Sequence, residues 1–322
     1  MKKTFAILGL LASFCALAPA AAQSYPTRPI TLVVAYPPGG STDTAARLLA
    51  ERMGRELGQS VVVENRPGAG GVIGASGVAK ARPDGYTLLF AASPELSIAG
   101  LTNKNLPYDP AKDFAPISTV GQVPFILVAN TGFAPNNVKE LIDHAKANPG
   151  KVNFSSFGNN TSNHLGGELF NAQAGIKMTH IPYRGSAPSL ADLMGGQVQV
   201  TFDTVTAVLP LIQGGKVKAL GVATAERSPL VPDLPTISES GLPGFTGGTW
   251  FALLAPAGAP QDVVARLSET VQGILKSEEI AQQFATRGIQ PSPSTPEGLR
   301  TFLASEIAKW SAAADKIGLK AE

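Results

Sequence analysis

Residues 30–53, ITLVVAYPPGGSTDTAARLLAERM, predict a buried strand, a glycine turn and an amphipathic helix in immediate succession. The first seven residues are mostly apolar, which is typical of a strand that is covered on both faces. After the turn, Ala45, Leu48, Leu49 and Met53 recur at the three-to-four spacing of one helix face. A strand that leads through a tight turn into a helix is the repeating unit of α/β proteins.

The same pattern recurs along the chain. SVVVEN at 60–65 and YTLLFAA at 86–92 continue the first series, and PFILVAN at 124–130 opens a second one. In the second series strands and helices alternate as far as VKALGVAT at 217–224. This alternation predicts an α/β fold with two doubly wound lobes, each with a mostly parallel sheet covered on both faces.

The C-terminal part of the chain is too short to form a third lobe. ERSPLVPDLPTISESGLPGF at 226–245 is rich in proline and is predicted to be irregular. A strand over 250–256 and two helices follow, the second of them entered through Ser294, Thr295 and Pro296.

We therefore expect the chain to cross between the lobes twice, through PFILVAN and through the approach to WFALLAP. Residues 23–123 and 249–322 would form lobe one, and residues 124–248 would form lobe two. Two domains in sequence, as in many enzymes, are the alternative layout.

The N-terminal residues 1–22, MKKTFAILGLLASFCALAPAAA, have the pattern of a secretory signal peptide, with two lysines, an apolar run and small residues before the cleavage site. Cleavage would remove Cys15, which is the only cysteine of the chain, and with it any thiol chemistry. It would also leave 26 − 2 = 24 basic residues against 24 acidic ones. A chain without net charge predicts neither nucleic acid nor a membrane surface as a partner. No later apolar run approaches membrane-spanning length, so we expect a soluble periplasmic protein.

The turn PPGGSTD lacks the lysine that a phosphate-binding P-loop carries after its last glycine. Gly39 and Gly40 nevertheless leave the backbone open to a ligand. The first N–H groups of the helix that follows have no partner inside the helix, and the helix dipole favours an anion there. Ser41 or Thr42 could cap the helix or contact the ligand. A well-capped turn without a ligand is the alternative interpretation.

Three further strand ends are followed by the same kind of turn: SSFGNNTSN at 155–163, PYRGSAP at 182–188 and FAASPELS at 90–97. In parallel α/β sheets, ligands bind at the carboxyl ends of the strands, where each of these turns must lie. Two lobes that face each other with such turns would form a cleft with N–H donors on both walls. A small carboxylate fits such a cleft.

Charged and titratable residues near these turns have two interpretations each. Arg184 could form paired hydrogen bonds with a carboxylate. Asp203 could receive an ammonium or hydroxyl group of the ligand, or could orient Arg184. A structural ion pair is the alternative for both residues. His164 lies near the start of its helix, and it could face the cleft or support the turn.

The sequence does not support three other functions: dinucleotide binding, zinc binding and serine hydrolysis. GAGGVIGA at 68–75 resembles a dinucleotide-binding turn, but a two-residue break separates it from its strand, so we favour close packing of a small-residue helix. The three histidines lack the spacing of a zinc site. The G-x-S-x-G motif of serine hydrolases is absent from the sequence. We expect no cofactor and no metal.

Four segments, in this order, carry a family resemblance: YPTRPITLVVAYPPGGSTD (25–43), VVVENRPGAGGVIGA (61–75) with DGYTLLF after it, GNNTSNHLGGELF (158–170) and HIPYRGSAPSLADLMGGQVQVTFD (180–203). With these segments the chain resembles the Bug-type extracytoplasmic solute receptors of the tripartite tricarboxylate transporter family. The resemblance extends from the end of the predicted signal peptide to the C-terminus.

The resemblance implies a type II periplasmic binding fold, in which two doubly wound α/β lobes are joined by two crossing hinge strands. It implies a receptor that binds a small organic carboxylate and delivers it to the membrane subunits of a transporter. We expect a monomer without enzymatic activity. The candidate ligand-binding residues in lobe one are Tyr36, Pro38, Gly39, Gly40, Ser41, Asp43, Ala92 and Ser93. Those in lobe two are Phe157, Gly158, Asn159, Thr161, Ser162, His164, Arg184, Gly185 and Asp203.

Two alternative functions remain open at the level of the sequence. A receptor that reports its ligand to a membrane kinase would bind in the same way. An exported two-domain α/β enzyme is disfavoured because no nucleophile and base occur at a recognisable spacing. Di- and tricarboxylates, amino acids and aromatic acids would all use the same backbone donors.

Overall fold

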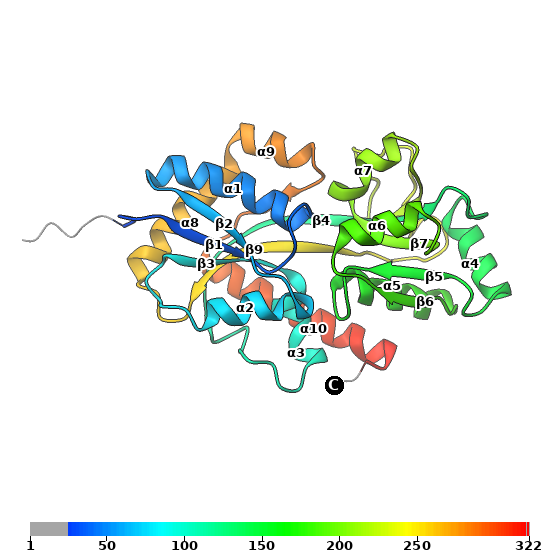
Figure 1. The fold of residues 1–322 in the computed structure, drawn as a ribbon, viewed down its shortest axis with the longest axis horizontal. Coiled ribbons are helices and arrows are strands. Elements are labelled where there is room, and N and C mark those ends of the chain that lie inside the picture. The colour runs from blue at the N-terminus through cyan, green and yellow to red at the C-terminus, as the bar shows by residue number, and fades with distance from the viewer. Residues whose placement is uncertain (1–24, 320, 322) are drawn as a thin grey trace, which may run out of the picture.

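The computed structural model describes residues 25–319 and 321. The predicted signal peptide at 1–22 lies outside the described residues. The chain forms two α/β lobes that are joined by two long strands (Figure 1). These crossing strands are β4 (Phe114–Asn130) and β9 (Gly248–Pro256).

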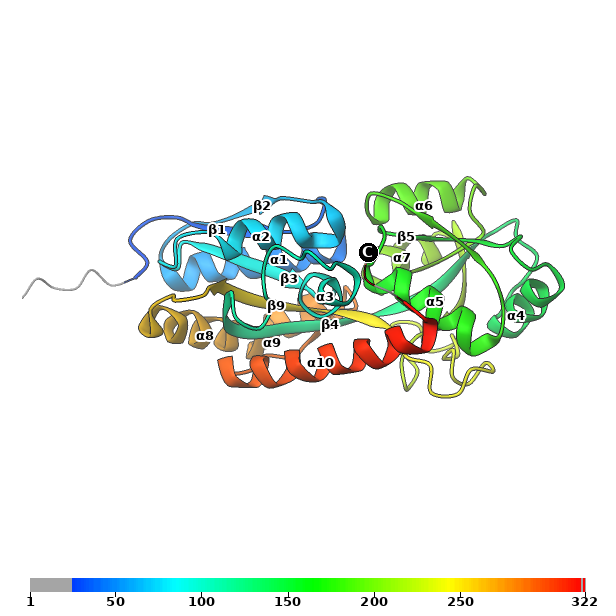
Figure 2. The same ribbon diagram turned by 90° about the horizontal axis from the view of Figure 1, so that it is seen from below.

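Lobe one contains both ends of the described chain. Its sheet has the strands β1 (Ile30–Val34), β2 (Val61–Asn65) and β3 (Thr87–Ala92), with the short β10 (Gln290–Pro291) on β4. Figures 1 and 2 show helices on both of its faces. One face carries α1 (Ser41–Leu57), α8 (Gln261–Lys276) and α9 (Glu278–Ala285). The other carries α2 (Val72–Ala79), α3 (Ala99–Thr102) and α10 (Pro296–Ile317), with the short helical turns η1 (Ala69–Gly71) and η2 (Pro94–Ile98) nearby.

Lobe two is the middle part of the chain. Its strands are β5 (Asn153–Ser156), β6 (Thr179–Pro182), β7 (Val200–Thr204) and β8 (Val217–Val222). Its helices are α4 (Val138–Ala147), α5 (Ser162–Ala174), α6 (Ser186–Met194) and α7 (Val205–Gln213). Five phenylalanines fill much of its core: Phe125, Phe154, Phe170, Phe202 and Phe245.

The strand order is β2-β1-β3-β9-β4-β7-β5-β6, and β4 is shared by the two lobes. From Phe114 to Pro124 it pairs with β9, and from Phe125 onward it pairs with β7 and β8. The partner of β4 changes between Pro124 and Phe125, next to the predicted start of lobe two at residue 124. The residue limits of the two lobes stay a prediction.

The sheets are mixed, so the expectation of mostly parallel sheets is wrong for the crossing strands. β1, β2 and β3 are mutually parallel, as are β7, β5 and β6. β9 is antiparallel to β3 and β4, and β4 is antiparallel to β7. The physical reason is that a chain that leaves a lobe and returns must run in opposite directions along its two crossings. Coverage on both faces also fails at the edge, because Val62 in β2 is 54% exposed.

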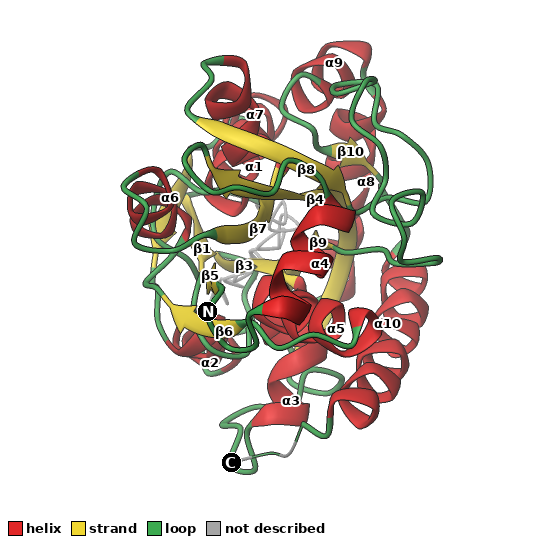
Figure 3. Ribbon diagram, turned by 90° about the vertical axis from the view of Figure 1, so that its right-hand side faces the viewer, coloured by secondary structure: helices red, strands yellow, loops and turns green. Residues whose placement is uncertain are grey.

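The segments from residue 226 onward agree in part with the sequence-based prediction. The passage 226–245 contains no helix or named strand. α10 begins at Pro296, and the hydroxyl of Thr295 accepts a hydrogen bond from Gly298 N–H, as the capping pattern predicts. α9 and β10 have no counterpart in the sequence-based prediction. The end of α10 packs against α5 of lobe two through Trp310 and Leu165 (Figure 3).

Within the described residues, none of the helices is both long and apolar enough to cross a membrane.

Candidate functional site

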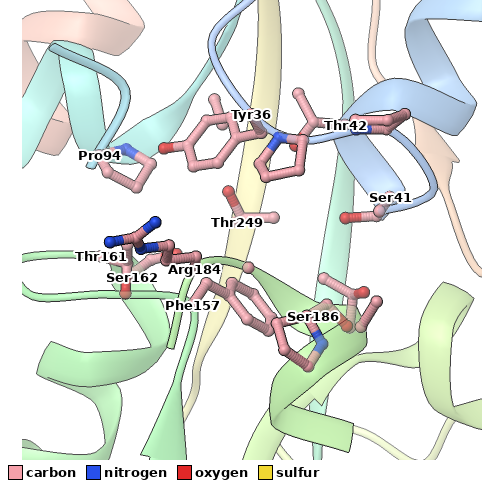
Figure 4. A pocket seen from close by; sticks show the side chains of 18 residues that line it. Tyr36, Ser41, Thr42, Pro94, Phe157, Thr161, Ser162, Arg184, Ser186 and Thr249 are labelled. Carbon is pink, nitrogen blue, oxygen red and sulfur yellow. The ribbon is translucent and has the colours of Figure 1, made fainter. Parts of the chain in front are cut away.

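A cavity lies between the two lobes, at the carboxyl ends of β1, β3, β5 and β7 (Figure 4). It contains about 610 Å³ of space that is free of protein atoms, part of which is open to solvent. Its lining from lobe one is Tyr36, Pro37, Pro38, Gly40, Ser41, Thr42, Ala92, Pro94 and Thr249. Its lining from lobe two is Phe157, Thr161, Ser162, Arg184, Gly185, Ser186, Ala187, Pro188 and Thr204.

Four helices begin at this cavity. Each of their N-cap residues lines it, and none of these N-caps forms a side-chain cap hydrogen bond. Among the helices that begin away from the cavity, α4 and α10 are capped by the side chains of Asn137 and Thr295, whereas α8 and α9 have no side-chain cap. The first N–H groups of an uncapped helix keep their capacity to donate, and the dipole adds positive potential. The four N-cap residues are Gly40 for α1, Thr161 for α5, Gly185 for α6 and Thr204 for α7.

Arg184 supplies the one formal charge of the lining within residues 25–319. Its side chain is exposed at the end of β6, and no hydrogen bond or ion pair joins it to another described residue. No carboxylate of the described chain lines the cavity. A guanidinium next to open helix starts, with no acidic group competing for it, makes the cavity selective for an anion.

The rest of the lining is largely apolar. The ring of Phe157 and four prolines form walls around the polar groups. Such walls exclude water and strengthen the hydrogen bonds that the polar groups can make. The lining prolines are Pro37, Pro38, Pro94 and Pro188.

Asp43 is buried behind the first glycine turn and does not line the cavity. Its carboxylate accepts hydrogen bonds from Gly39 N–H at 3.0 Å, Arg47 Nε at 2.9 Å and Asn65 Nδ2 at 2.9 Å. Burial acts to raise the pKa of Asp43, but these donors outweigh it and hold the pKa below its ordinary value. Asp43 therefore fixes the shape of the PPGG turn as an ionised group.

Asp203 is also fully buried and does not line the cavity. Ser186 Oγ donates to Asp203 Oδ2 at 2.7 Å, and Thr204 N–H donates to Asp203 Oδ1 at 2.7 Å. Burial raises the pKa of Asp203 to about 7, although these hydrogen bonds oppose the rise. The residue thus holds the starts of α6 and α7, two of the open helix ends.

Glu95 is a buried carboxyl group behind the cavity wall that sequence reasoning missed. It is fully buried in η2, where its carboxyl group accepts from Ala92 N–H at 2.6 Å and from the Tyr36 hydroxyl at 2.8 Å. Burial raises the pKa of Glu95 to about 7 and raises that of Tyr36 as well. Glu95 joins the ends of β1 and β3 at the cavity wall. Its one signal in the sequence is its place in the turn FAASPELS.

The glycine-rich segment 68–75 packs closely against this wall. A Cβ on Gly71 would lie 2.9 Å from Glu95 Oε2, and one on Gly74 would lie 2.8 Å from Ala35 Cβ. Real Cβ atoms do not approach so closely, so glycine is required at both positions. The expectation that this small-residue segment packs closely is confirmed.

His164 lies beneath the turn of residues 157–161 and does not line the cavity. Its ring stacks on His180 with the centroids 3.8 Å apart, and its Nδ1 accepts from Asn160 N–H at 3.1 Å. His180 Nε2 lies 2.6 Å from Ser156 Oγ. Burial lowers the pKa of His164 to about 4 and that of His180 to about 3, with His164 adding to the second shift. The pair supports the turn from below. No group of three or more potential metal-ligating side chains occurs in the described residues.

Gly39, Ser93, Gly158 and Asn159 are the remaining candidates outside the lining. The hydroxyl of Ser93 lies 3.1 Å from that of Thr249, which does line the cavity. Gly158 accepts from the Thr161 hydroxyl, and Asn159 is exposed next to it.

The structure brings ten of the seventeen candidates together in the cavity lining: Tyr36, Pro38, Gly40, Ser41, Ala92, Phe157, Thr161, Ser162, Arg184 and Gly185. Gly39, Asp43, Ser93, Gly158, Asn159, His164 and Asp203 lie behind or beside that lining. A contact with a ligand stays a prediction for all seventeen.

Eight further lining residues were not among the candidates: Pro37, Thr42, Pro94, Ser186, Ala187, Pro188, Thr204 and Thr249. Five of them adjoin a candidate in sequence, and Ala187 and Pro188 follow the candidate Gly185 by two and three residues. Thr249 has no such signal, because it follows the irregular passage and enters the site from β9.

The two lobes approach each other at the rim of the cavity. A Cβ on Gly185 would lie 3.3 Å from Pro37 Cγ, and one on Gly70 would lie 3.3 Å from the carbonyl oxygen of Asn159. Both contacts join lobe one to lobe two. The two lobes therefore come close together at these two points, while part of the cavity stays open to solvent.

Comparison with known proteins agrees with this architecture. Residues 45–319 match the family described as "Tripartite tricarboxylate transporter family receptor". Protein BugT of Bordetella pertussis is 39% identical over 322 residues, which cover 99% of each chain.

Three solved structures are similar throughout. A structure described as "R. palustris Rpa4515 with adipate" has a TM-score of 0.90 and 36% identity, covering 92% of this chain and all of that one. The periplasmic binding protein BugD has a TM-score of 0.88 and 38% identity with the same coverage. MatC from Rhodopseudomonas palustris with bound malate has a TM-score of 0.85 and 34% identity, covering 90% of this chain and 99% of that one.

The predicted two-lobed periplasmic binding fold is confirmed by these structures. The family match extends over most of the chain, from within α1 to the end of α10. The chain therefore belongs to the receptors of the tripartite tricarboxylate transporter family.

Proposed function

We propose that this chain is a periplasmic solute receptor that binds a small organic carboxylate between its lobes and leaves it chemically unchanged. The observation that carries this proposal is the convergence of four uncapped helix starts and Arg184 on one cavity. A carboxylate accepts hydrogen bonds and carries negative charge, which is what this lining supplies. Similar proteins with bound adipate and malate support the same class of ligand.

The composition of the lining supports a receptor that does not change its ligand chemically. No histidine or lysine of residues 25–319 lines the cavity. The hydroxyl of Ser186 is engaged with a buried carboxyl group and has no imidazole beside it. The Ser-His pair that activates the nucleophile of serine hydrolases is therefore missing at Ser186.

Delivery of the carboxylate to the membrane subunits of a tripartite tricarboxylate transporter is the further step of the proposal. The family description supports it. The receptor would act as a monomer in the periplasm after loss of residues 1–22. Disruption of the genes for candidate membrane subunits tests this step: uptake of the bound carboxylate should stop, and uninterrupted uptake would count against it.

Binding is tested by thermal unfolding and calorimetry with adipate and malate, and with adipamide as a neutral counterpart of adipate. A carboxylate at a concentration of 100 times its Kd should stabilise the protein by about 2.7 kcal/mol and be recovered unchanged. Adipamide should have no effect, because it lacks the charge that Arg184 and the helix dipoles attract. Equal stabilisation by adipamide, or conversion of the acid, would contradict the proposal.

A further inference from the structure

In lobe one, a buried carboxyl group lies directly behind the cavity wall. Glu95 holds two lining residues at once, since Tyr36 donates to one of its oxygens and Ala92 N–H to the other. The titratable groups that face it are the phenols of Tyr36 from β1 and of Tyr108, which donates to the carbonyl oxygen of Glu95. The neighbouring η1 presents glycine. No cationic side chain of the described residues bonds to Glu95.

The helix α10 also packs on η2, and it brings no counter-charge to Glu95. Its buried carboxyl group, Glu306, is engaged with Trp250 Nε1 at 2.8 Å and Lys309 at 3.1 Å. The other buried residues that α10 presents on this side are Leu299, Leu303 and Trp310.

Lobe two repeats this arrangement on the opposite side of the cavity. Asp203 holds Ser186 and Thr204, which both line the cavity. The nearby α5 contributes Asn163, whose amide donates to Phe202 O and not to the carboxyl group of Asp203. Arg184 is the charged side chain at the cavity, and no hydrogen bond or ion pair of the described chain joins it to Asp203. Both carboxyl groups are thus buried without a cation, and burial raises the pKa of each to about 7.

The protonation state of each carboxyl group decides what its lining hydroxyl can offer to a ligand. An ionised carboxylate only accepts hydrogen bonds, so Ser186 must donate its proton to Asp203 and can show only lone pairs to the cavity. A ligand carboxylate also only accepts hydrogen bonds, so it cannot form one with the Ser186 hydroxyl in that state. A protonated Asp203 can donate to Ser186, and the Ser186 proton is then free to donate to the ligand. Protonation of Glu95 frees the Tyr36 proton in the same way, and the carbonyl oxygen of Gly70, at 3.2 Å, then competes with the ligand for it.

Charge repulsion also favours protonated carboxyl groups when an anion is bound. An anion in the cavity would lie one side chain away from each buried carboxyl group, and like charges in a poorly solvated place repel strongly. We propose that Glu95 and Asp203 each hold a proton from solvent when a carboxylate occupies the cavity, so that the receptor takes up protons as it binds. This inference rests on the proposed function. It makes both side chains positioning residues that select anions.

Calorimetry in buffers of different ionisation enthalpy measures this proton uptake, with adipate and malate as probes. At pH 7 and above, the wild type should take up protons, to a limit of about two, one for each carboxyl group. Its affinity should fall by up to about tenfold per pH unit for each proton taken up as the pH rises from 7 to 8.5. Glu95→Gln and Asp203→Asn should each remove their share of the uptake. An uptake of zero in the wild type, or an uptake unchanged in both variants, would overturn the inference.

Glu306→Gln is the matched control, because Glu306 is buried and its hydrogen-bond partners, Trp250 and Lys309, do not line the cavity. It should leave the proton uptake unchanged.

A second measurement stands apart from ligand binding. In ligand-free protein with labelled side-chain carboxyl carbons, two signals should titrate near pH 7, and they should be absent from Glu95→Gln and Asp203→Asn respectively. If adipate and malate fail to bind while these signals titrate near 7, the choice of ligand is wrong and the carboxyl assignment stands. If both signals titrate below pH 5 in the ligand-free protein and still do so with adipate or malate bound, the inference fails.

Discussion

Single residues decide what the cavity accepts, and Gly40 is the clearest example. It is the N-cap of α1, it lines the cavity, and its φ of −81° suits any residue. A Cβ there would meet no atom within 4 Å, so a side chain can be added without a clash in the protein. Gly39 next to it differs, because its φ of 89° strains any other residue.

The substitution Gly40→Val should weaken carboxylate binding by tenfold or more, which is about 1.4 kcal/mol, because its methyl groups would occupy the space over the open N–H groups. The free energy of unfolding should change little. Gly39→Val is the matched comparison, and it should destabilise the fold by about 1–2 kcal/mol. Calorimetry and urea unfolding of both variants give the two quantities. Unchanged affinity in Gly40→Val would show that the ligand does not use this helix start.

Arg184 is the second residue whose effect on ligand binding can be tested by a single substitution. Arg184→Met keeps much of the side-chain length and removes the charge, and it should cost about 1.5–3 kcal/mol of carboxylate binding. Arg82→Met serves as the control, because Arg82 is highly exposed and lies outside the lining. Equal affinities of the two variants in calorimetry would mean that the guanidinium does not meet the ligand.

At the scale of elements, the position of α5 depends on two adjacent glycines. A Cβ on Gly167 would overlap the ring of Phe154 in β5, whereas a Cβ on Gly166 would meet nothing within 4 Å. Gly167 thus sets how closely the helix lies on its sheet. The start of α5 at the cavity follows from that closeness, because the helix is one rigid element.

Gly167→Ala should therefore destabilise the protein by about 1–3 kcal/mol through overpacking, and should weaken binding by displacing the start of α5. Gly166→Ala should instead stabilise it by about 0.5–1 kcal/mol, because alanine suits a helix interior better than glycine. Urea unfolding of the two variants compares them directly. Destabilisation of equal size would remove the argument for close packing at position 167.

The stacked histidines connect β6 to α5, and they predict an acid-sensitive element. Burial holds the pKa values of His164 and His180 below the ordinary 6.5, so the unfolded chain binds protons first as the pH falls. Their contribution to stability is complete above pH 6.5 and is lost as the pH falls toward 4 and 3. His180→Phe keeps a ring against Phe154 but binds no proton, so its unfolding free energy should depend less on pH in this window than that of the wild type. Parallel pH profiles would contradict this.

At the scale of the whole molecule, the sequence predicted the two lobes and most of the cavity lining. These features could be predicted because apolar strands, glycine turns and helix starts each depend on consecutive residues, such as those of PPGGSTD. Strand direction was missed at β9, because it depends on where the chain returns to the first lobe. Glu95 and Thr249 were missed because their roles arise from burial and from contacts between distant segments. Asp43, Asp203 and His164 lie outside the lining because hydrogen bonds with their own turns hold these side chains behind or beneath it.

The rim contacts of Gly185 with Pro37 and of Gly70 with Asn159 bring the two lobes together over the cavity. Closure of this kind places donors from both lobes around one ligand, so neither lobe alone should bind it tightly. The central claim is therefore that one anion is shared between helix starts of opposite lobes.

A crystal structure of the complex with adipate or malate tests this claim most directly. We predict a ligand carboxylate between the lobes, with its oxygens within about 3 Å of an N–H group in the first turn of α1 and of a donor from α5, α6 or Arg184. A carboxylate bound outside the cavity, or held by one lobe without contact to any helix start, would contradict the account.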